Sequence, residues 1–303
     1  MNGQAQTTHG IVVGYDGSPG SQAALEWAAQ TARLQGKGLA LMYSVNLSTL
    51  PAVDVTQLEP SVEQAAKSLV DEGSDRAGAT LDTSQIVTKY WIGSAAGQLI
   101  EASKDAELVV VGSRGRGRIL AGLLGSTSYA VAAHAHCPVV VVRGSAGVEP
   151  GDVSAVRPGP DHAVVVGTDD SDAAARAVDA AVEVAEREGA ELHIVSVAHP
   201  HSMESWAYVE TAKAGTEKTH ALREQAEQSL SRAAARVASL HPEVTVTTEV
   251  LYGEPGQSLA DLGATAGLIV VGSRGRGGFT GLLLGSVSHR VIHDAACPVM
   301  VVR

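Results

Sequence analysis

Two glycine-rich stretches contain the residues of this chain whose types and spacing best suit chemistry. One, GSRGRGRILAGLLGS, runs from Gly112 to Ser126, and the other, GSRGRGGFTGLLLGS, runs from Gly272 to Ser286. Both fit the pattern G-x2-G-x9-G-[ST], which average residue usage predicts about 0.01 times in a chain of this length. Glycines let a backbone approach a ligand closely, and the N–H groups of such loops attract anions. The stretches are therefore typical of phosphate binding.

The elements around each stretch support this interpretation. Short β-branched runs, residues 108–111 and 268–271, come before the stretches, and segments with helical character follow them. Each glycine-rich stretch is therefore predicted to lie between a strand and a helix N-terminus, where unpaired N–H groups favour anions. Positive charge could come from the arginines of the two stretches, which are Arg114, Arg116 and Arg118 in the first and Arg274 and Arg276 in the second.

A second motif also occurs twice. Residues 11–18, IVVGYDGS, and residues 164–171, VVVGTDDS, predict a buried strand that ends in a turn. The motif places Gly14 and Asp16 in the first copy and Gly167 and Asp169 in the second. The aspartates can either contact a ligand or fill the turn and cap role that Asp often takes.

Helical periodicity follows both copies of this motif. After Ser18, Pro19 can occupy the first helical turn. The residues predicted to share one face of this helix are Ala24, Trp27, Ala28, Thr31 and Leu34. In the second half, Ser171 is the predicted N-cap, and the predicted buried residues are Ala174, Ala177, Val178, Ala181, Val182 and Ala185.

The remaining elements alternate in the same way in both halves. Further strands are expected at residues 39–45, 85–91 and 139–143, and again at 192–197, 244–251 and 299–303. A long helix precedes the third strand, and its second copy has a predicted core stripe of Leu222, Ala226, Leu230, Ala233, Val237 and Leu240. Corresponding motifs are 153 residues apart early and 160 apart later, so the second half has extra residues, which we place in the segment 200–217.

This alternation predicts an α/β protein with parallel, doubly wound sheets. The length of 303 residues suits two domains that each bury a core. The segment 144–161 contains Gly, Pro and Ser without any period. We therefore predict a first domain at residues 1–147, a linker at 148–161 and a second domain at 162–303.

Charge and hydropathy exclude several classes of function. A formal net charge of −11 argues against broad nucleic-acid or anionic-membrane binding, which depends on Lys and Arg. No apolar run approaches the ~18 residues of a membrane span, and the polar start resembles no signal peptide. We expect a cytoplasmic protein without membrane insertion, in which Cys137 and Cys297 are buried, reduced thiols.

Together with the flanking sequence, the two motifs resemble the ATP-binding branch of the universal stress protein family, in its tandem two-domain form. The resemblance covers almost the whole chain. It implies five parallel strands per domain in the order 3-2-1-4-5. Ligands of such sheets bind where the winding reverses, between strands 1 and 4, so Asp16 and Gly112 would meet at one crevice.

The resemblance also implies roles for individual residues. Asp16 and Asp169 would lie at the adenine end, beside the backbone of Ser44 or Val197, and Gly112 and Gly272 would contact the ribose. The implied phosphate loops are Gly115, Arg116, Gly117, Gly125, Ser126 and Thr127, and Gly275, Arg276, Gly277, Gly285, Ser286 and Val287. Two ATP molecules per chain are expected, with Mg²⁺ held largely by phosphate oxygens and water and no dedicated protein ligands. A purely structural role of the glycines in tight turns is the alternative.

Other motifs do not fit. The chain has no G-x4-G-K-[ST] phosphate loop, and no G-x-G-x-x-G follows the first strand. His134, His136 and Cys137 could suggest a metal site, but their alternation sends His134 and Cys137 in different directions, and the second half has Asp294, Ala296 and Cys297 there. We do not predict a metal site at these residues.

With this resemblance, the sequence favours an ATP-binding stress regulator that is non-enzymatic or barely hydrolytic, whose nucleotide state controls conformation or the binding of an unidentified protein partner. One alternative is a slow ATPase or phosphotransferase, although no base or second carboxylate accompanies the arginines. Another is an interaction scaffold with a structural nucleotide. The family's dimers imply intramolecular pairing of the two domains through their fifth strands, and a homodimer stays open.

Overall fold

The computed structural model describes residues 9–45, 55–115, 124–143, 157–199, 217–276 and 283–303. The chain divides into two compact units, residues 1–153 and 154–303, and each is described by itself. Residues 200–216, where we place the extra segment of the second half, lie outside the described residues.

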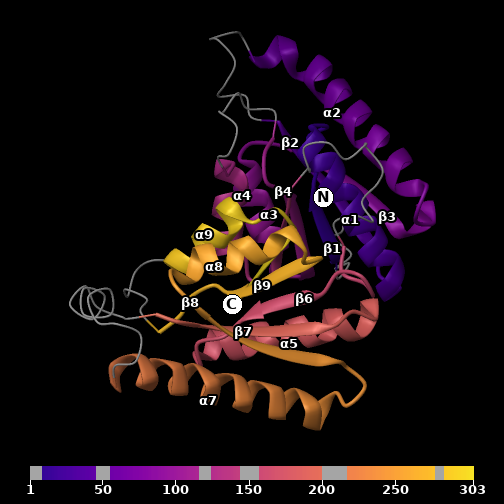
Figure 1. Ribbon diagram of the computed structural model, residues 1–303. Helices are drawn as coiled ribbons and strands as arrows, with labels where there is room; N and C mark the ends of the chain where they lie inside the picture. Colours follow the sequence, from indigo (N-terminus) through magenta and orange to yellow (C-terminus); the bar gives the residue numbers. More distant parts are fainter. Residues whose placement is uncertain (1–8, 46–54, 116–123, 144–156, 200–216, 277–282) are drawn as a thin grey trace. The chain divides into compact units, whose positions relative to one another are not determined.

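The first unit alternates strands and helices as predicted (Figure 1). Its elements are β1 (His9–Gly14), α1 (Pro19–Gln35), β2 (Leu39–Val45), α2 (Val55–Gly78), the 3₁₀ turn η2 (Thr83–Gln85), β3 (Ile86–Ile92), α3 (Ala95–Ala102), β4 (Ala106–Gly112), α4 (Ser126–His134) and β5 (Val139–Val142). Its strands are ordered β3-β2-β1-β4-β5, and neighbouring strands are parallel.

The second unit repeats this topology. Its elements are β6 (Val164–Gly167), α5 (Asp172–Glu188), β7 (Leu192–Ala198), α7 (Glu217–Leu240), β8 (Val246–Tyr252), α8 (Pro255–Asp261), the 3₁₀ turn η4 (Leu262–Ala264), β9 (Leu268–Gly272), α9 (Ser286–Asp294) and β10 (Val299–Val302). Its strands are ordered β8-β7-β6-β9-β10, and neighbouring strands are parallel. When the strands of this unit are numbered 1 to 5 along the chain, this order is again 3-2-1-4-5. The predicted doubly wound α/β fold is confirmed in both halves.

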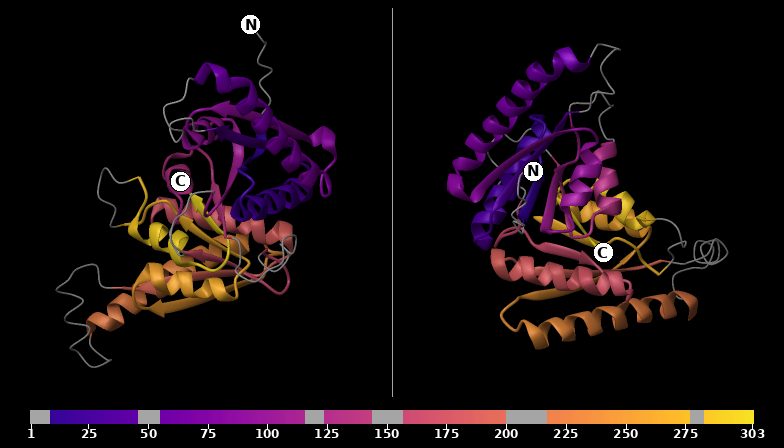
Figure 2. Two further views of the ribbon diagram at one scale, coloured as in Figure 1. Left: turned by 90° about the horizontal axis from the view of Figure 1, so that it is seen from above. Right: turned by 180° about the vertical axis from the view of Figure 1, so that it is seen from behind.

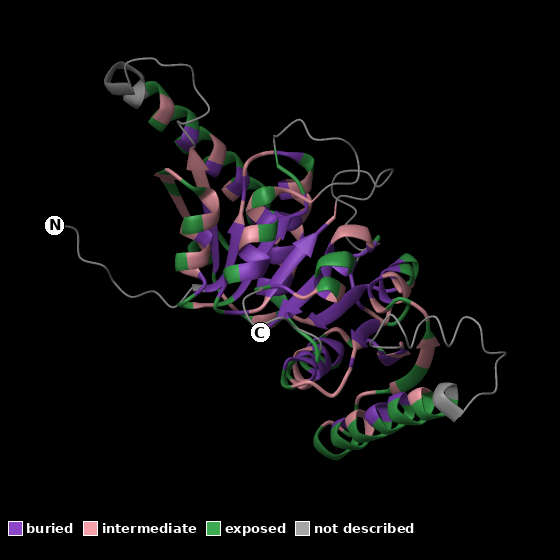
Figure 3. Ribbon diagram, turned by 90° about the vertical axis from the view of Figure 1, so that its left-hand side faces the viewer, coloured by how far each residue is buried: buried purple, intermediate pink, exposed green. Residues whose placement is uncertain are grey.

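Helices cover both faces of each sheet. In the first unit α1 packs against α2 and α3 against α4, and in the second unit α5 packs against α7 and α8 against α9. The long helix α7 runs beside β8 (Figure 2). The central strands are buried, whereas the outward sides of the helices are exposed (Figure 3). Strands covered on both sides are near-continuous apolar runs, such as residues 108–111, because both side-chain directions meet helices.

The first helix of each unit begins and ends as its sequence dictates. Ser18 caps α1 by accepting from the N–H of Ser21 at 3.3 Å, and Pro19 follows in the first turn. Ser171 caps α5 by accepting from Ala174 N at 3.2 Å, which confirms the predicted N-cap. Gly36 and Gly189 then end these helices with φ of 62° and 63°, a left-handed conformation that glycine adopts without strain.

Two residues of the predicted core stripes are exposed instead. Leu34 of α1 is 46% exposed and Leu240 of α7 is 63% exposed. Leu34 lies within about 20° of the buried Trp27 around the helix, so it is on the right face, but it is the second-last residue of α1, beyond Ala32, the last buried residue of that helix. Leu240 lies on the right face, but it is the last residue of α7, where coverage by the sheet ends.

Candidate functional site

The first candidate site lies where β1 and β4 end side by side. Val13 and Val110 are partners in the β1–β4 register, so Asp16, just beyond β1, and Gly112, the last residue of β4, reach the same edge of the sheet. A cavity of about 260 Å³ opens there. The described residues predicted for this site all line it: Gly14, Asp16, Ser44, Gly112, Arg114, Gly115, Gly125, Ser126 and Thr127. Arg116, Gly117 and Arg118 lie outside the described residues.

The second unit has a cavity at the corresponding place, between the ends of β6 and β9. Its volume is about 500 Å³, within the range usual for small-molecule sites. The described residues predicted for it again all line it: Gly167, Asp169, Val197, Gly272, Arg274, Gly275, Arg276, Gly285, Ser286 and Val287. Gly277 lies outside the described residues. The repeated motifs therefore meet at one cavity in each unit.

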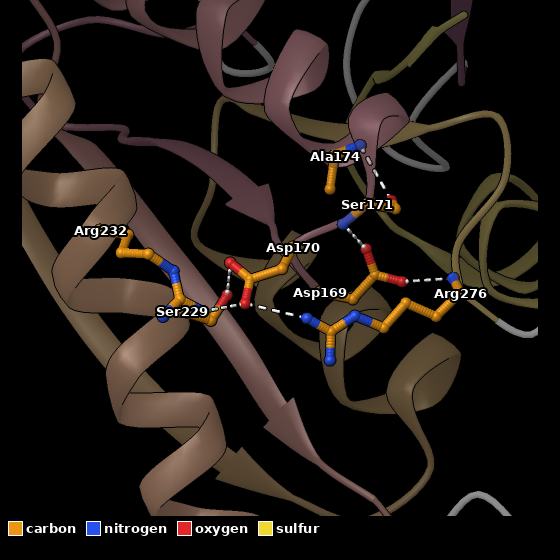
Figure 4. Close-up of polar contacts among 7 residues, drawn as sticks. All are labelled: Asp169, Asp170, Ser171, Ala174, Ser229, Arg232 and Arg276. Carbon is orange, nitrogen blue, oxygen red and sulfur yellow. Dashed lines mark hydrogen bonds and ion pairs between the residues drawn. The ribbon is translucent and has the colours of Figure 1, made fainter.

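The two aspartates have turn roles while they line the cavities. Asp16 Oδ1 accepts from Ser18 N at 3.0 Å and from Ser18 Oγ at 2.5 Å. Asp169 Oδ1 accepts from Ser171 N at 3.0 Å, and its Oδ2 accepts from Arg276 N at 2.9 Å (Figure 4). The turn role that the sequence left open is thus present, and in the second unit it fastens the end of β6 to the glycine loop.

Close packing explains why the strands that precede the glycine loops end in glycine. A Cβ atom on Gly112 would lie 2.5 Å from the carbonyl of Gly20, in the first turn of α1. A Cβ on Gly272 would lie 2.8 Å from the carbonyl carbon of Ala173, at the start of α5. Backbone atoms cannot move aside as a flexible side chain can, so glycine is required here even without a ligand. The structural role that we kept as an alternative is real at these two positions.

The glycine loops close onto helix N-termini. Gly125 N donates to Ser113 O and Gly285 N donates to Ser273 O, each at 2.8 Å, and these glycines are the N-cap residues of α4 and α9. A glycine N-cap has no side chain that could accept from the first-turn N–H groups. Since the first residues of both helices line the cavities, each cavity meets the positive end of a helix dipole.

A serine that sequence reasoning missed fixes each of these helices. Ser128 Oγ donates to the carbonyl of Gly112 and Ser288 Oγ donates to that of Gly272, both at 2.6 Å. Both serines are buried. A signal was present, because a serine stands two positions after Ser126 and again after Ser286. These bonds hold the helix N-terminus against the end of the preceding strand.

Comparison with known proteins decides the family. The model of the universal stress protein family matches residues 8–143 and again 162–303. The chain belongs to the universal stress protein family. This confirms the resemblance to the family and its tandem form, while membership of the ATP-binding branch stays a prediction.

Full-length relatives share the tandem arrangement. Universal stress protein Rv2005c of Mycobacterium tuberculosis is 35% identical over 303 residues, which cover 97% of each chain. Universal stress protein Rv2623 of the same organism is 35% identical over 307 residues, covering 97% of this chain and 96% of its own. A solved universal stress protein of Archaeoglobus fulgidus is similar over 98% of this chain and 99% of its own, with a TM-score of 0.68 and 24% identity, which shows a shared fold.

The two cavities of this universal stress protein differ most at the end away from the glycine loop. Tyr43 and Trp91 line the first cavity, while their counterparts in the second unit, Ser196 and Leu251, are smaller and do not. His199 and Glu254 line the second cavity instead. Sequence reasoning missed all of these side chains, because their types do not recur between the halves. The larger aromatic side chains agree with the smaller first cavity.

Glu254 also has a structural role. Its carboxylate caps α8 by accepting from Gly256 N at 3.0 Å and from Gln257 N at 2.7 Å. The counterpart in the first unit is Ser94, which caps α3 through Gly97 N at 3.3 Å. His199 Nδ1 lies 2.8 Å from the carbonyl of Gly253. Both cavity-lining side chains of the second unit are therefore held in place by backbone groups.

Among the described residues, a charged cluster in the second of these stress-protein domains has no counterpart in the first; it surrounds Asp170, the residue after the cavity aspartate. Its Oδ2 accepts from Arg276 Nη2 at 2.9 Å and also from Arg232 of α7, while its Oδ1 accepts from Ser229 Oγ at 3.0 Å (Figure 4). Burial raises the pKa of Asp170, but the hydrogen bonds from Arg232 and Ser229 and the charges of Arg232 and Arg276 outweigh it, so the pKa is lowered from its ordinary value. Asp170 is therefore a carboxylate with two positively charged partners.

Elsewhere the described residues offer no further site of the predicted kinds. No three His, Cys, Asp or Glu side chains among them are placed to hold a metal ion. Cys137 and Cys297 are buried thiols that are not joined in a disulfide, as predicted. Burial raises the pKa of the Cys137 thiol to about 11. Within the same described ranges, no helix has both the length and the apolar character needed to cross a membrane.

Proposed function

We propose that each domain of this universal stress protein binds one ATP and that the nucleotide state controls conformation or the binding of a protein partner. The observation that carries the proposal is the same in both units. A carboxylate from the first strand, a glycine loop with arginines and an uncapped helix N-terminus line one cavity.

The residues present fit a nucleotide. N–H groups of Ser126 and Thr127, or of Ser286 and Val287, are suited to donate to phosphate oxygens at the start of a nine-residue helix. Arg114, Arg274 and Arg276 can neutralise phosphate charge. The apolar lining at the other end, which includes Tyr43 and Trp91 in the first unit, suits a base, and we place Asp16 or Asp169, at the end of the first strand, at this adenine end. Mg²⁺ would bridge phosphate oxygens and keep most of its waters, since carboxylates are few here.

The same lining argues for a regulator over an enzyme. Hydrolysis needs a group that orients the attacking water and charge that is stabilised in the transition state. The cavity carboxylates Asp16, Asp169 and Glu254 accept hydrogen bonds from backbone N–H groups. These bonds hold the carboxylates in place and make them poorly suited to act as a catalytic base. We therefore propose slow or no ATP turnover.

Calorimetric titration of nucleotide-free protein with ATP and Mg²⁺ tests the proposal. We expect two sites per chain, one of which is lost in Gly115→Glu and the other in Gly275→Glu, because a glutamate side chain would fill the cavity with negative charge. Gly159→Glu is a matched control, since an added Cβ there meets nothing within 4 Å. No binding by the wild-type protein, or full stoichiometry in the double variant, would contradict the proposal.

Turnover is measured separately, by phosphate release at saturating ATP. We expect a rate far below the ~10 per second typical of enzymes. A rate on the order of 1 per second or faster, abolished by the same glycine substitutions, would assign the chain to ATP-hydrolysing enzymes instead. A pull-down in which the protein partner binds equally well with and without ATP would favour an interaction scaffold with a structural nucleotide.

A further inference from the structure

Asp170 occupies a backbone position that suits glycine. Its φ is 64°, and it is the one non-glycine residue in the described part of the chain with a positive φ. The first unit has Gly17 at the corresponding position, with φ of 76°. Asp tolerates this left-handed conformation better than most residues but still prefers others. The contacts of its side chain give a reason for an aspartate here.

These contacts join two parts of the second unit. Arg276 belongs to the glycine loop and lines the cavity, whereas Ser229 and Arg232 belong to α7. Both arginines donate to the same oxygen, Asp170 Oδ2 (Figure 4). The Asp170 side chain is 20% exposed, so water screens the two ion pairs only in part. Because one oxygen is shared, a stronger bond to one arginine weakens the bond to the other.

The first unit cannot form this cluster. Gly17 has no side chain that could take the place of Asp170. Because β3 and β8 begin 160 residues apart, the residue of the first unit that corresponds to Arg232 is Glu72 of α2. Glu72 accepts from Tyr15 Oη and from Arg76 Nε, each at 3.3 Å. An acidic residue thus stands where the second unit has a basic one. The shared-oxygen arrangement belongs to the second unit among the described residues.

We propose that Asp170 is a regulatory latch that competes with the phosphates of a bound nucleotide for Arg276 and thereby couples the second site to α7. This inference rests on the proposed nucleotide binding. A polyphosphate carries more negative charge than one carboxylate, so it draws Arg276 away from Asp170. Oδ2 is then left to Arg232 alone, and α7 is held more firmly. By the reciprocity of linked equilibria, changes at α7 alter phosphate affinity.

The latch predicts that substitutions of Asp170 and of Arg232 change ATP affinity in opposite directions. In a Gly115→Glu background, which leaves the second site alone, Asp170→Asn frees Arg276 and strengthens ATP binding about two- to fivefold, the range of a part-exposed ion pair. Asn also tolerates the left-handed backbone. Arg232→Gln leaves Oδ2 to Arg276 and weakens ATP binding by a similar factor. Adenosine, which has no phosphate, binds equally to all variants.

Two further variants separate the latch from a general effect of charge. Asp172→Asn makes the same charge change two residues away, on a residue that is exposed in the first turn of α5, and leaves ATP affinity unchanged. In an Arg276→Gln background, Asp170→Asn no longer strengthens ATP binding, because there is no arginine to release. If the effect of Asp170→Asn persists without Arg276, it arises from the field around Asp170 and the latch is overturned.

Hydrogen exchange of α7 gives a readout that affinity alone does not. ATP is expected to slow amide exchange around Ser229 and Arg232, adenosine is not, and Asp170→Asn abolishes the difference. Unchanged exchange of α7 at saturating ATP would overturn the latch while leaving nucleotide binding intact. Failure of ATP to bind the wild-type protein would overturn the proposed function and the latch together.

Discussion

The carboxylate of Asp16 lies against the backbone of Gly115, although almost a hundred residues separate them in the chain. A Cβ atom on Gly115 would lie only 2.5 Å from Asp16 Oδ2, and one on Gly275 would collide with the same oxygen of Asp169. The two motifs found in the sequence are therefore in direct contact. The glycine at this position leaves room for the aspartate as well as for a ligand.

Replacing Gly115 with alanine tests this contact. The added methyl group has to displace the Asp16 carboxylate, which also holds Ser18 N and Ser18 Oγ. We expect ATP affinity at the first site to fall about fivefold or more, which corresponds to about 1 kcal/mol. Calorimetry in a Gly275→Glu background measures it, and Gly159→Ala is the control. Unchanged affinity would show that the Asp16 position does not matter for the ligand.

Ser128 is expected to matter for stability. Ser128→Ala leaves the carbonyl of Gly112 without its side-chain donor in a buried place, which costs about 1 to 3 kcal/mol. For a domain of this size the unfolding temperature of the first domain should fall by roughly 3 to 9 °C. Scanning calorimetry measures this. Ser126→Ala, at an exposed neighbour, should shift it far less, and equal shifts for both variants would contradict the role assigned to Ser128.

The buried Cys137 thiol makes stability depend on alkaline pH. Burial raises its pKa from 9.0 to about 11, so the folded state favours the protonated thiol. This contribution is complete below pH 9 and is lost as the pH rises from 9 toward 11, by up to about 1.4 kcal/mol per pH unit. Cys137→Ala should flatten this part of the pH profile of unfolding. Rapid alkylation of the native thiol at pH 8 would be inconsistent with a buried, protonated group.

The two sites should differ in affinity, with the first binding ATP more tightly. From sequence, Arg118 adds a cation that Gly278 cannot supply, and Asp170 adds negative charge to the second site; residues 118 and 278 lie outside the described residues. The structure changes the second argument, because the charge of Asp170 is balanced by Arg232 and Arg276. Asp170 is expected to weaken ATP binding at the second site because its ion pair with Arg276 competes with the phosphates for that arginine.

We expect a difference of roughly threefold to tenfold, as about 1 kcal/mol implies. It is measured by titrating each site alone, in the Gly275→Glu and Gly115→Glu backgrounds. Arg118→Gly should narrow the difference by weakening ATP binding at the first site. Asp170→Asn should narrow it by strengthening ATP binding at the second site. Equal affinities in the two backgrounds would show that neither charge sets the order.

Sequence patterns by themselves determined the α/β fold and the repeat, and the place of both candidate sites followed from the strand order that the family resemblance implied. Alternating strands and helices specify a parallel sheet, and helix caps such as Ser171 act through neighbours in the chain, so local patterns suffice. The ends of the first and fourth strands had to meet once the strand order was known, which is why Asp16 and Gly112 could be brought together in advance. Leu34 and Leu240 show the limit of periodicity, which marks a helix face but not how far the sheet covers it.

Only the tertiary structure decided which partners these side chains take. That Gly112 is packed against the carbonyl of Gly20, and that Ser128 bonds back to Gly112, depend on distances between elements that no sequence pattern encodes. The same holds for Asp170. Read along the chain it is an extra negative charge beside Asp169, but the fold brings Arg232 from α7 and Arg276 from the glycine loop to one of its oxygens. Contacts between residues about sixty and a hundred positions apart are fixed by packing, and they turn that charge into a link between a cavity and a helix.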